Sequence, residues 1–167
     1  MLPAYTTSRG GCAFRTGAIL AGAPLFSVET QNAASPHTPV FIRRIRFECT
    51  DGTAAHLSLW NIAANHNQGT TLVPAVSFNT DLACQVDVAT AWAANPTPGA
   101  LGIYKRDVLP GSIGASVDWQ FDEDASLFLP IRDDTGAASY GGVVVINEGA
   151  VATGAIDVIL ELEAFVP

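Results

Sequence analysis

The segment AIDVILELEAF, residues 155–165, alternates apolar and mostly acidic side chains more regularly than any other part of the chain. Successive side chains of a β-strand point to opposite faces of its sheet, so this period of two predicts a strand with one buried face. We expect Asp157, Glu161 and Glu163 to face outward. The predicted inward side chains are those of Ile156, Val158, Leu160, Leu162 and Ala164.

Further short apolar segments follow one another along the chain, separated by Gly, Pro, Asn and Asp residues that favour turns. About eight such strands with almost no helix predict an all-β fold, an antiparallel β-sandwich of the jelly-roll type. TDGT, residues 50–53, predicts a hairpin because Asp-Gly suits the left-handed positions of a tight turn. The predicted strands before residue 155 are PLFSVET, VFIRRIRFEC, AHLSLWNI, LGIYKRDV, ASVDWQF, SLFLPI and YGGVVVINEG. The predicted core includes Phe41, Ile45, Phe47, Leu57, Leu59, Val158, Leu160 and Leu162.

The chain has 167 residues, which suits one domain with an appendage. Residues 1–24 are rich in Gly, Ala, Thr and Ser without a period, so we expect an extended N-terminal arm with little structure of its own. Residues 25–167 then form the β-sandwich domain. Within it, residues 63–100 predict a loop-rich insertion that carries a short strand or a helical turn. The segment ACQVDVAT fits a short strand. The alternative is a short helix that is capped by Asn79 or Thr80 and has Leu82, Val86, Ala89 and Ala93 on one face.

The segment VFIRRIRFEC, residues 40–49, carries Arg43, Arg44 and Arg46, three of the eight cationic residues. A net charge of -8 and a single lysine, Lys105, oppose binding to nucleic acid or to an anionic membrane, which needs clustered cations. Alternation places Arg44 and Arg46 on the polar face and Arg43 on the apolar one. We expect these arginines to pair with the carboxylates of residues 155–165 across two neighbouring strands, with a contact to an acidic neighbour as the alternative.

The sequence offers little catalytic chemistry. The three histidines have no partner at metal-ligand spacing, and three cysteines at wide spacings imply no disulfide framework. GSIGAS lacks the strand-to-helix elbow of a hydrolase nucleophile. We therefore expect no catalytic residue, no cofactor and no enzyme activity. The residues considered are His37, His56, His66, Cys12, Cys49 and Cys84.

Two acidic segments, DEDAS and RDDTG, form the candidate ion site. Oxygen ligands from two neighbouring loops could hold Ca²⁺, although the spacing is not that of an EF-hand. Paired carboxylates for glycoside hydrolysis would need a cleft between them. Acidic loop tips are more often solvated turns, which is the reading we favour. The candidate calcium ligands are Asp122, Asp124, Asp133 and Asp134.

The chain resembles small β-sandwich virion proteins of tailed bacteriophages in three segments that follow one another in the same order. These segments are GAILAGAPLFSVETQN, VFIRRIRFECTDGTAAHLSLWNI and DLACQVDVATAWAANPTPG. The resemblance spans most of residues 17–165 and is a pattern of strands and turns without a diagnostic signature. Proteins of this kind serve as head decoration (cement) proteins or as head-fibre, tail or baseplate components. No catalytic residue is carried over, because such proteins have none.

The resemblance implies a non-enzymatic structural virion protein, a capsid decoration protein that stabilises a phage head by bridging capsid subunits. Only 14% of the residues are charged, against about 25% in an average domain, which suits a surface covered by other subunits. The expected partners are the major capsid protein or other virion subunits and two further copies in a homo-trimer, with neither nucleic acid nor membrane. Without a signal-peptide pattern at its start, we expect the chain to be made in the host cytoplasm and located on the capsid surface.

Two alternatives belong to other functional classes. A receptor- or carbohydrate-binding module of a phage tail or head fibre would group exposed aromatic side chains on one loop face, and Trp92, Tyr104 and Trp119 are the candidates. A small hydrolase on a sandwich scaffold would need convergent polar residues in a deep pocket.

Overall fold

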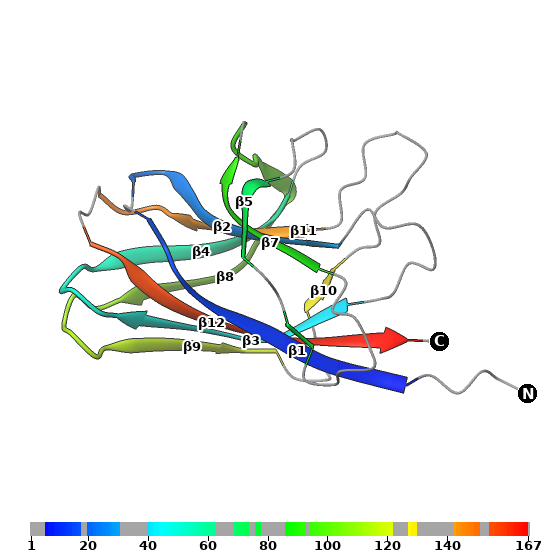
Figure 1. The fold of residues 1–167 in the computed structure, drawn as a ribbon. Helices are drawn as coiled ribbons and strands as arrows, with labels where there is room; N and C mark the ends of the chain where they lie inside the picture. The colour runs from blue at the N-terminus through cyan, green and yellow to red at the C-terminus, as the bar shows by residue number, and fades with distance from the viewer. Residues whose placement is uncertain are drawn as a thin grey trace, which may run out of the picture.

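The computed structural model describes residues 6–17, 20–30, 40–62, 69–73, 76–77, 86–92, 94–121, 127–129, 142–150 and 154–166. Within these ranges the chain forms twelve strands and no helix, arranged in two sheets (Figure 1). The strands are β1 (Thr6–Arg15), β2 (Ala23–Thr30), β3 (Val40–Cys49), β4 (Ala55–Ile62), β5 (Gly69–Val73), β6 (Val76–Ser77), β7 (Val86–Trp92), β8 (Pro98–Leu109), β9 (Ser116–Gln120), β10 (Leu127–Leu129), β11 (Gly142–Asn147) and β12 (Ile156–Val166).

The strands pair as one long antiparallel ribbon that is rolled up. The first half of the chain pairs with the second half in reverse order, β1 with β12, β2 with β11, β3 with β9 and β10, and β4 with β8. Rolling the ribbon brings β12 beside β3 and β11 beside β4. The central strands therefore run β1-β12-β3-β9 in the first sheet and β2-β11-β4-β8 in the second. This is the topology of a jelly roll, and the predicted fold class is confirmed.

The core lies between the two sheets and is built around aromatic side chains. Phe47 contacts Trp119 edge to face at a centroid distance of 4.8 Å and Phe26 at 6.2 Å, so the aromatic contacts join strands of both sheets. Each of these three side chains is fully buried. Of the eight predicted core residues, seven are buried and Phe41 is half-buried.

A β-bulge in β3 explains the exception. Arg44 pairs with Glu161 of β12, whereas Ile42 pairs with Leu162, so Arg43 is an extra residue in the ladder. An extra residue reverses the phase of alternation, which is why Ile42 is buried before the bulge and Ile45 after it. The prediction that Phe41 and Arg43 share the face of Ile45 is wrong because it assumed an unbroken period of two.

The expectation of an unstructured N-terminal arm is wrong for residues 6–15. These residues form β1, which pairs with β12 at ten successive positions and belongs to the same sandwich as the rest of the chain. The glycine content that suggested an arm has a packing reason at Gly11, where an added Cβ would collide with the backbone oxygen of Leu160. Residues 1–5, 18 and 19 lie outside the described ranges.

Two further expectations change with the topology. The Asp51-Gly52 turn has the left-handed glycine that its sequence predicts, with φ of 84° at Gly52, but it joins β3 of the first sheet to β4 of the second. It is therefore a connection between sheets, and the predicted hairpin is wrong.

The insertion contains strands in its described part. β7 lies beside β2 and extends the second sheet, whereas β6 pairs with Gly10 and Gly11 of β1 in the first. The strand reading is thus confirmed for residues 86–92, and the helical reading is wrong at Val86 and Ala89. The proposed capping residues Asn79 and Thr80, and also Leu82 and Ala93, lie outside the described ranges.

Candidate functional site

The outer face of the first sheet carries a lattice of ion pairs, which we call the ion-pair lattice. Alternation in β12 points Asp157, Glu161 and Glu163 to this face, and the neighbouring strands place arginines opposite them. The expected pairing with the carboxylates of residues 155–165 is confirmed for Arg43 and Arg44, whereas Arg46 pairs with Glu48 of its own strand. The lattice consists of Arg9–Glu163 (4.0 Å), Arg15–Asp157 (2.7 Å), Arg43–Glu163 (2.5 Å), Arg44–Asp118 (2.5 Å), Arg44–Glu161 (3.3 Å) and Arg46–Glu48 (3.7 Å).

Two carboxylates of the lattice are held in the ionised form. Arg44 donates from Nε (2.8 Å) and Nη2 (2.5 Å) to Asp118, and these hydrogen bonds lower the pKa of the Asp118 carboxyl below its ordinary value. Arg15 donates from Nε (2.7 Å) and Nη2 (3.0 Å) to Asp157 and likewise lowers the pKa of that carboxyl. Both arginines gain a raised pKa from the same bonds. Arg44–Asp118 and Arg15–Asp157 are therefore bidentate, charge-assisted pairs in which both partners stay ionised.

The other cations of the described chain also have partners. Arg106 pairs with Glu148 at 2.9 Å. Lys105 donates to the backbone oxygen of Gln120 at 3.4 Å and lies 5.1 Å from the ring centre of Phe121. Within the described residues, the arginines and the lysine thus form no cluster of unpaired positive charge of the kind that phosphate binding uses.

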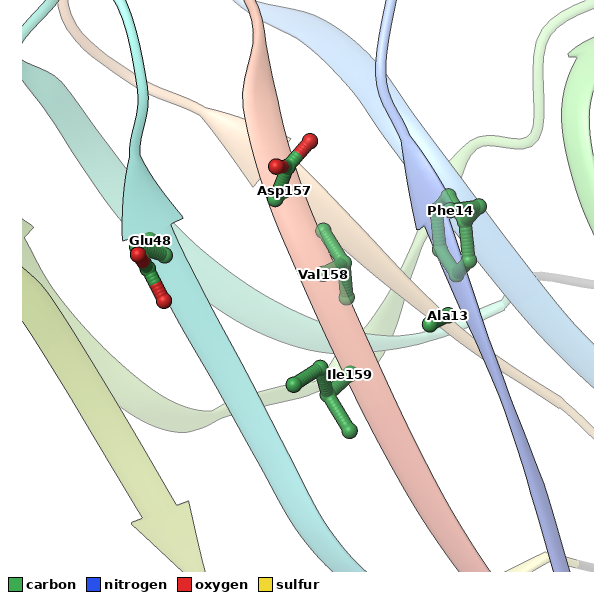
Figure 2. A pocket seen from close by; sticks show the side chains of 6 residues that line it. All are labelled: Ala13, Phe14, Glu48, Asp157, Val158 and Ile159. Carbon is green, nitrogen blue, oxygen red and sulfur yellow. The ribbon is translucent and has the colours of Figure 1, made fainter. Parts of the chain in front are cut away.

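A shallow hollow of about 350 Å³ lies in the same face, between β1, β12 and β3 (Figure 2). Ala13 and Ile159 are cross-strand partners in its floor, and Ile159 is 41% exposed. Glu48 and Asp157 stand at the rim as direct cross-strand neighbours. The lining offers two carboxylates among apolar groups, and each carboxylate is paired with an arginine, Asp157 with Arg15 and Glu48 with Arg46, so the hollow fits a contact surface.

The candidate calcium ligands Asp122, Asp124, Asp133 and Asp134 lie outside the described residues, as do His37, His66 and Cys84. Cys49 is buried at the end of β3, where its thiol donates to the backbone oxygen of Thr53 at 3.4 Å. No group of three or more His, Cys, Asp or Glu side chains in the described ranges is placed to hold a metal ion. None of the described segments forms a helix of the length and apolarity needed to cross a membrane.

The three aromatic candidates are not brought together. Trp119 is fully buried in the core. Tyr104 is 47% exposed on β8, at one edge of the second sheet. Trp92, at the end of β7, donates from its indole nitrogen to Ser27 Oγ at 3.1 Å, and three strands separate β7 from β8. An aromatic binding face built from these residues is therefore not present.

The sequence reasoning missed a buried layer on the outer face of the second sheet. Val144 and Ile146 of β11 are buried there with Ile62, and Trp60 packs against them while its indole donates to Ser58 Oγ at 2.8 Å. The signal lies in GVVVIN, whose unbroken apolar run is typical of a strand that is covered on both faces.

No family model and no curated protein matches the chain. Among solved structures, it is similar to a chain of the extra small virus (XSV) VLP of the giant freshwater prawn Macrobrachium rosenbergii, with 9% identity, a TM-score of 0.35, and coverage of 98% of this chain and 82% of that one. It is also similar to the 60-mer BFDV capsid protein, with 10% identity, a TM-score of 0.23, and coverage of 99% and 93%. Both neighbours are viral capsid structures. At these values neither likeness decides a function, and the jelly-roll fold rests on the strand order described above.

Proposed function

We propose that the chain is a non-enzymatic structural protein of a virion, a capsid decoration protein of a bacteriophage head that bridges neighbouring capsid subunits. In this role it works as a homo-trimer on the capsid surface, is made in the host cytoplasm, and contacts the major capsid protein or other virion subunits. Neither nucleic acid nor membrane is part of the proposal.

The observation that supports the proposal most is the ion-pair lattice. A sheet face that is covered by another subunit loses its water, and an unpaired charge buried in this way is costly. In the lattice, Arg44 and Arg15 already satisfy Asp118 and Asp157, so a neutral partner surface can cover this face without leaving those charges unpaired. The low overall charge content of 14% points the same way.

The binding-module alternative is less well supported. It requires exposed aromatic residues on one loop face, and Trp119 lies in the core instead. The hydrolase alternative requires convergent catalytic groups in a deep pocket, whereas the two carboxylates that line the hollow of Figure 2, Glu48 and Asp157, are each paired with an arginine.

The test is the heat resistance of particles. A protein that binds the assembled shell but not its free subunits stabilises the shell by mass action. Phage heads saturated with this chain should therefore release their DNA at a higher temperature than heads from which the chain has been removed, and adding the purified chain back should restore the difference. Equal release temperatures for the three preparations would contradict the proposal.

A further inference from the structure

Ile113 is displayed at the tip of the turn between β8 and β9. Its side chain is 77% exposed, the largest value among the exposed large apolar residues of the described chain. The turn around it is fixed by hydrogen bonds from the Ala115 amide to the Ser112 carbonyl (2.9 Å) and from the Gly114 amide to the Cys49 carbonyl (2.8 Å). An apolar side chain on a backbone held in this way loses little freedom on binding, so it is suited to anchor a protein contact.

The hollow on the first sheet carries apolar side chains in its lining. Ala13 and Ile159 are among the apolar side chains that line it (Figure 2). The carboxylates at its rim have arginine partners, Arg15 for Asp157 and Arg46 for Glu48. The turn that carries Ile113, residues 110–115, contains no charged residue. An uncharged tip that seats in a hollow with a charge-balanced rim brings no unpaired charge into the contact.

We propose that Ile113 of one copy seats in the hollow of a second copy, against Ile159 and Ala13. The tip belongs to a turn and the hollow to a sheet face, so the contact joins two different surfaces of the chain. Two such patches can also pair reciprocally in a two-fold dimer. In the heterologous arrangement each tip enters the hollow of the next copy, a rotation that divides a full circle closes the ring, and three copies make the trimer of the proposed function. The inference rests on that function for its setting, but the contact itself is a property of the purified chain.

Sedimentation velocity over rising protein concentration tests the contact. The wild-type chain should form a closed oligomer, whereas Ile113→Asp and Ile159→Asp should each weaken association by about tenfold or more, because each places a charge in the apolar seat. The matched control is Leu20→Asp, which alters another exposed apolar residue (55%), in the turn between β1 and β2, and should associate as the wild type does. Circular dichroism spectra that overlay the wild type establish that all three variants are folded.

Mixing the two variants gives the sharper test. Each retains one intact half of the contact, the hollow in Ile113→Asp and the tip in Ile159→Asp, so an equimolar mixture should form a heterodimer and no ring. A wild-type chain that stays monomeric at about 1 mM, an effect of only one of the two aspartates, or a mixture without heterodimer would overturn the inference. If the ring forms but the chain does not bind phage heads, the proposed function fails while the contact stands.

Discussion

Arg43 and Glu163 form an ion pair across the bulge of β3, with Arg43 Nε 2.5 Å from Glu163 Oε2. Glu163 is buried although it belongs to the outward-facing set of β12, and the guanidinium of Arg43 also lies over the ring of Phe41 at 5.3 Å. The extra residue in the ladder thus turns an arginine away from the core and toward a carboxylate that needs a partner. This pair ties the register of β3 to that of β12 at the point where the phase of alternation changes.

Arg43→Met should lower the free energy of unfolding by about 1–3 kcal/mol, because it leaves the buried Glu163 carboxylate without its nearest cation. The double variant Arg43→Met/Glu163→Gln should recover part of that loss, since the charge that needs a partner is also removed. Urea unfolding of the wild type, Arg43→Met, Glu163→Gln and the double variant measures the coupling free energy between the two side chains. Arg106→Met, at a more exposed ion pair, is the control and should stay within about 0.5 kcal/mol of the wild type.

Leu160→Ala should cost about 2–5 kcal/mol, because Leu160 is fully buried between the sheets and its loss leaves a cavity. The adjacent residue supplies a matched control, since Ile159 points to the outer face of the same strand. Ile159→Ala, measured at a concentration where the chain is monomeric, should change stability by about 0.5 kcal/mol or less. Similar losses for the two variants would show that the inward and outward faces of β12 are wrongly assigned.

Deletion of residues 1–17 should prevent stable folding, because β1 covers the whole length of β12. The truncated chain would expose one edge of β12 and the partly buried side of the core that Cys12 and Phe14 cover. Heat denaturation followed by circular dichroism should show no cooperative transition. Deletion of residues 1–5, which precede β1, is the control and should leave the transition in place. A cooperative transition near the wild-type temperature in the longer deletion would instead support an independent arm.

Stability should fall in acid through Asp118 and Asp157. Their pKa values are lower in the folded than in the unfolded chain, so their contribution is present above the unfolded value of about 4 and is lost as the pH falls through the folded values. The Asp118→Asn/Asp157→Asn variant should lose stability at pH 7 and show a flatter decline between about pH 5 and pH 2. Asp107→Asn, whose carboxylate accepts a hydrogen bond from the Val108 amide, should keep the steep decline.

Much of the fold could be predicted from the period of two. β12 and β9 could be predicted because inward and outward residues alternate along them. In β9, for example, the buried Val117 and Trp119 alternate with exposed residues. β1 was missed because its inward side carries Gly10 beside Cys12 and Phe14, and glycine gives no apolar signal even where the backbone is buried. The error at Phe41 has another cause, since an unbroken period of two was assumed although the buried positions change phase between Ile42 and Ile45.

The candidate site was predictable in part. Opposite charges on two strands of similar length indicated that residues 40–49 and 155–165 lie side by side, and the register places Arg44 opposite Glu161. The same pattern could not show that Asp118 on β9 would engage Arg44 from the other side, because that depends on which strand borders β3. The hollow is likewise a product of topology, since Ala13 and Ile159 become neighbours through a pairing of the two ends of the chain.

The most direct test of the proposed function is a cryo-EM reconstruction of phage particles that contain this chain. Density for the jelly roll should repeat over the head surface, with three copies around each three-fold or quasi-three-fold axis and a contact of about 1,000 Å² or more between each copy and the shell. Tip and hollow of neighbouring copies should meet within each group of three. Density confined to the tail tip would contradict a role in capsid decoration.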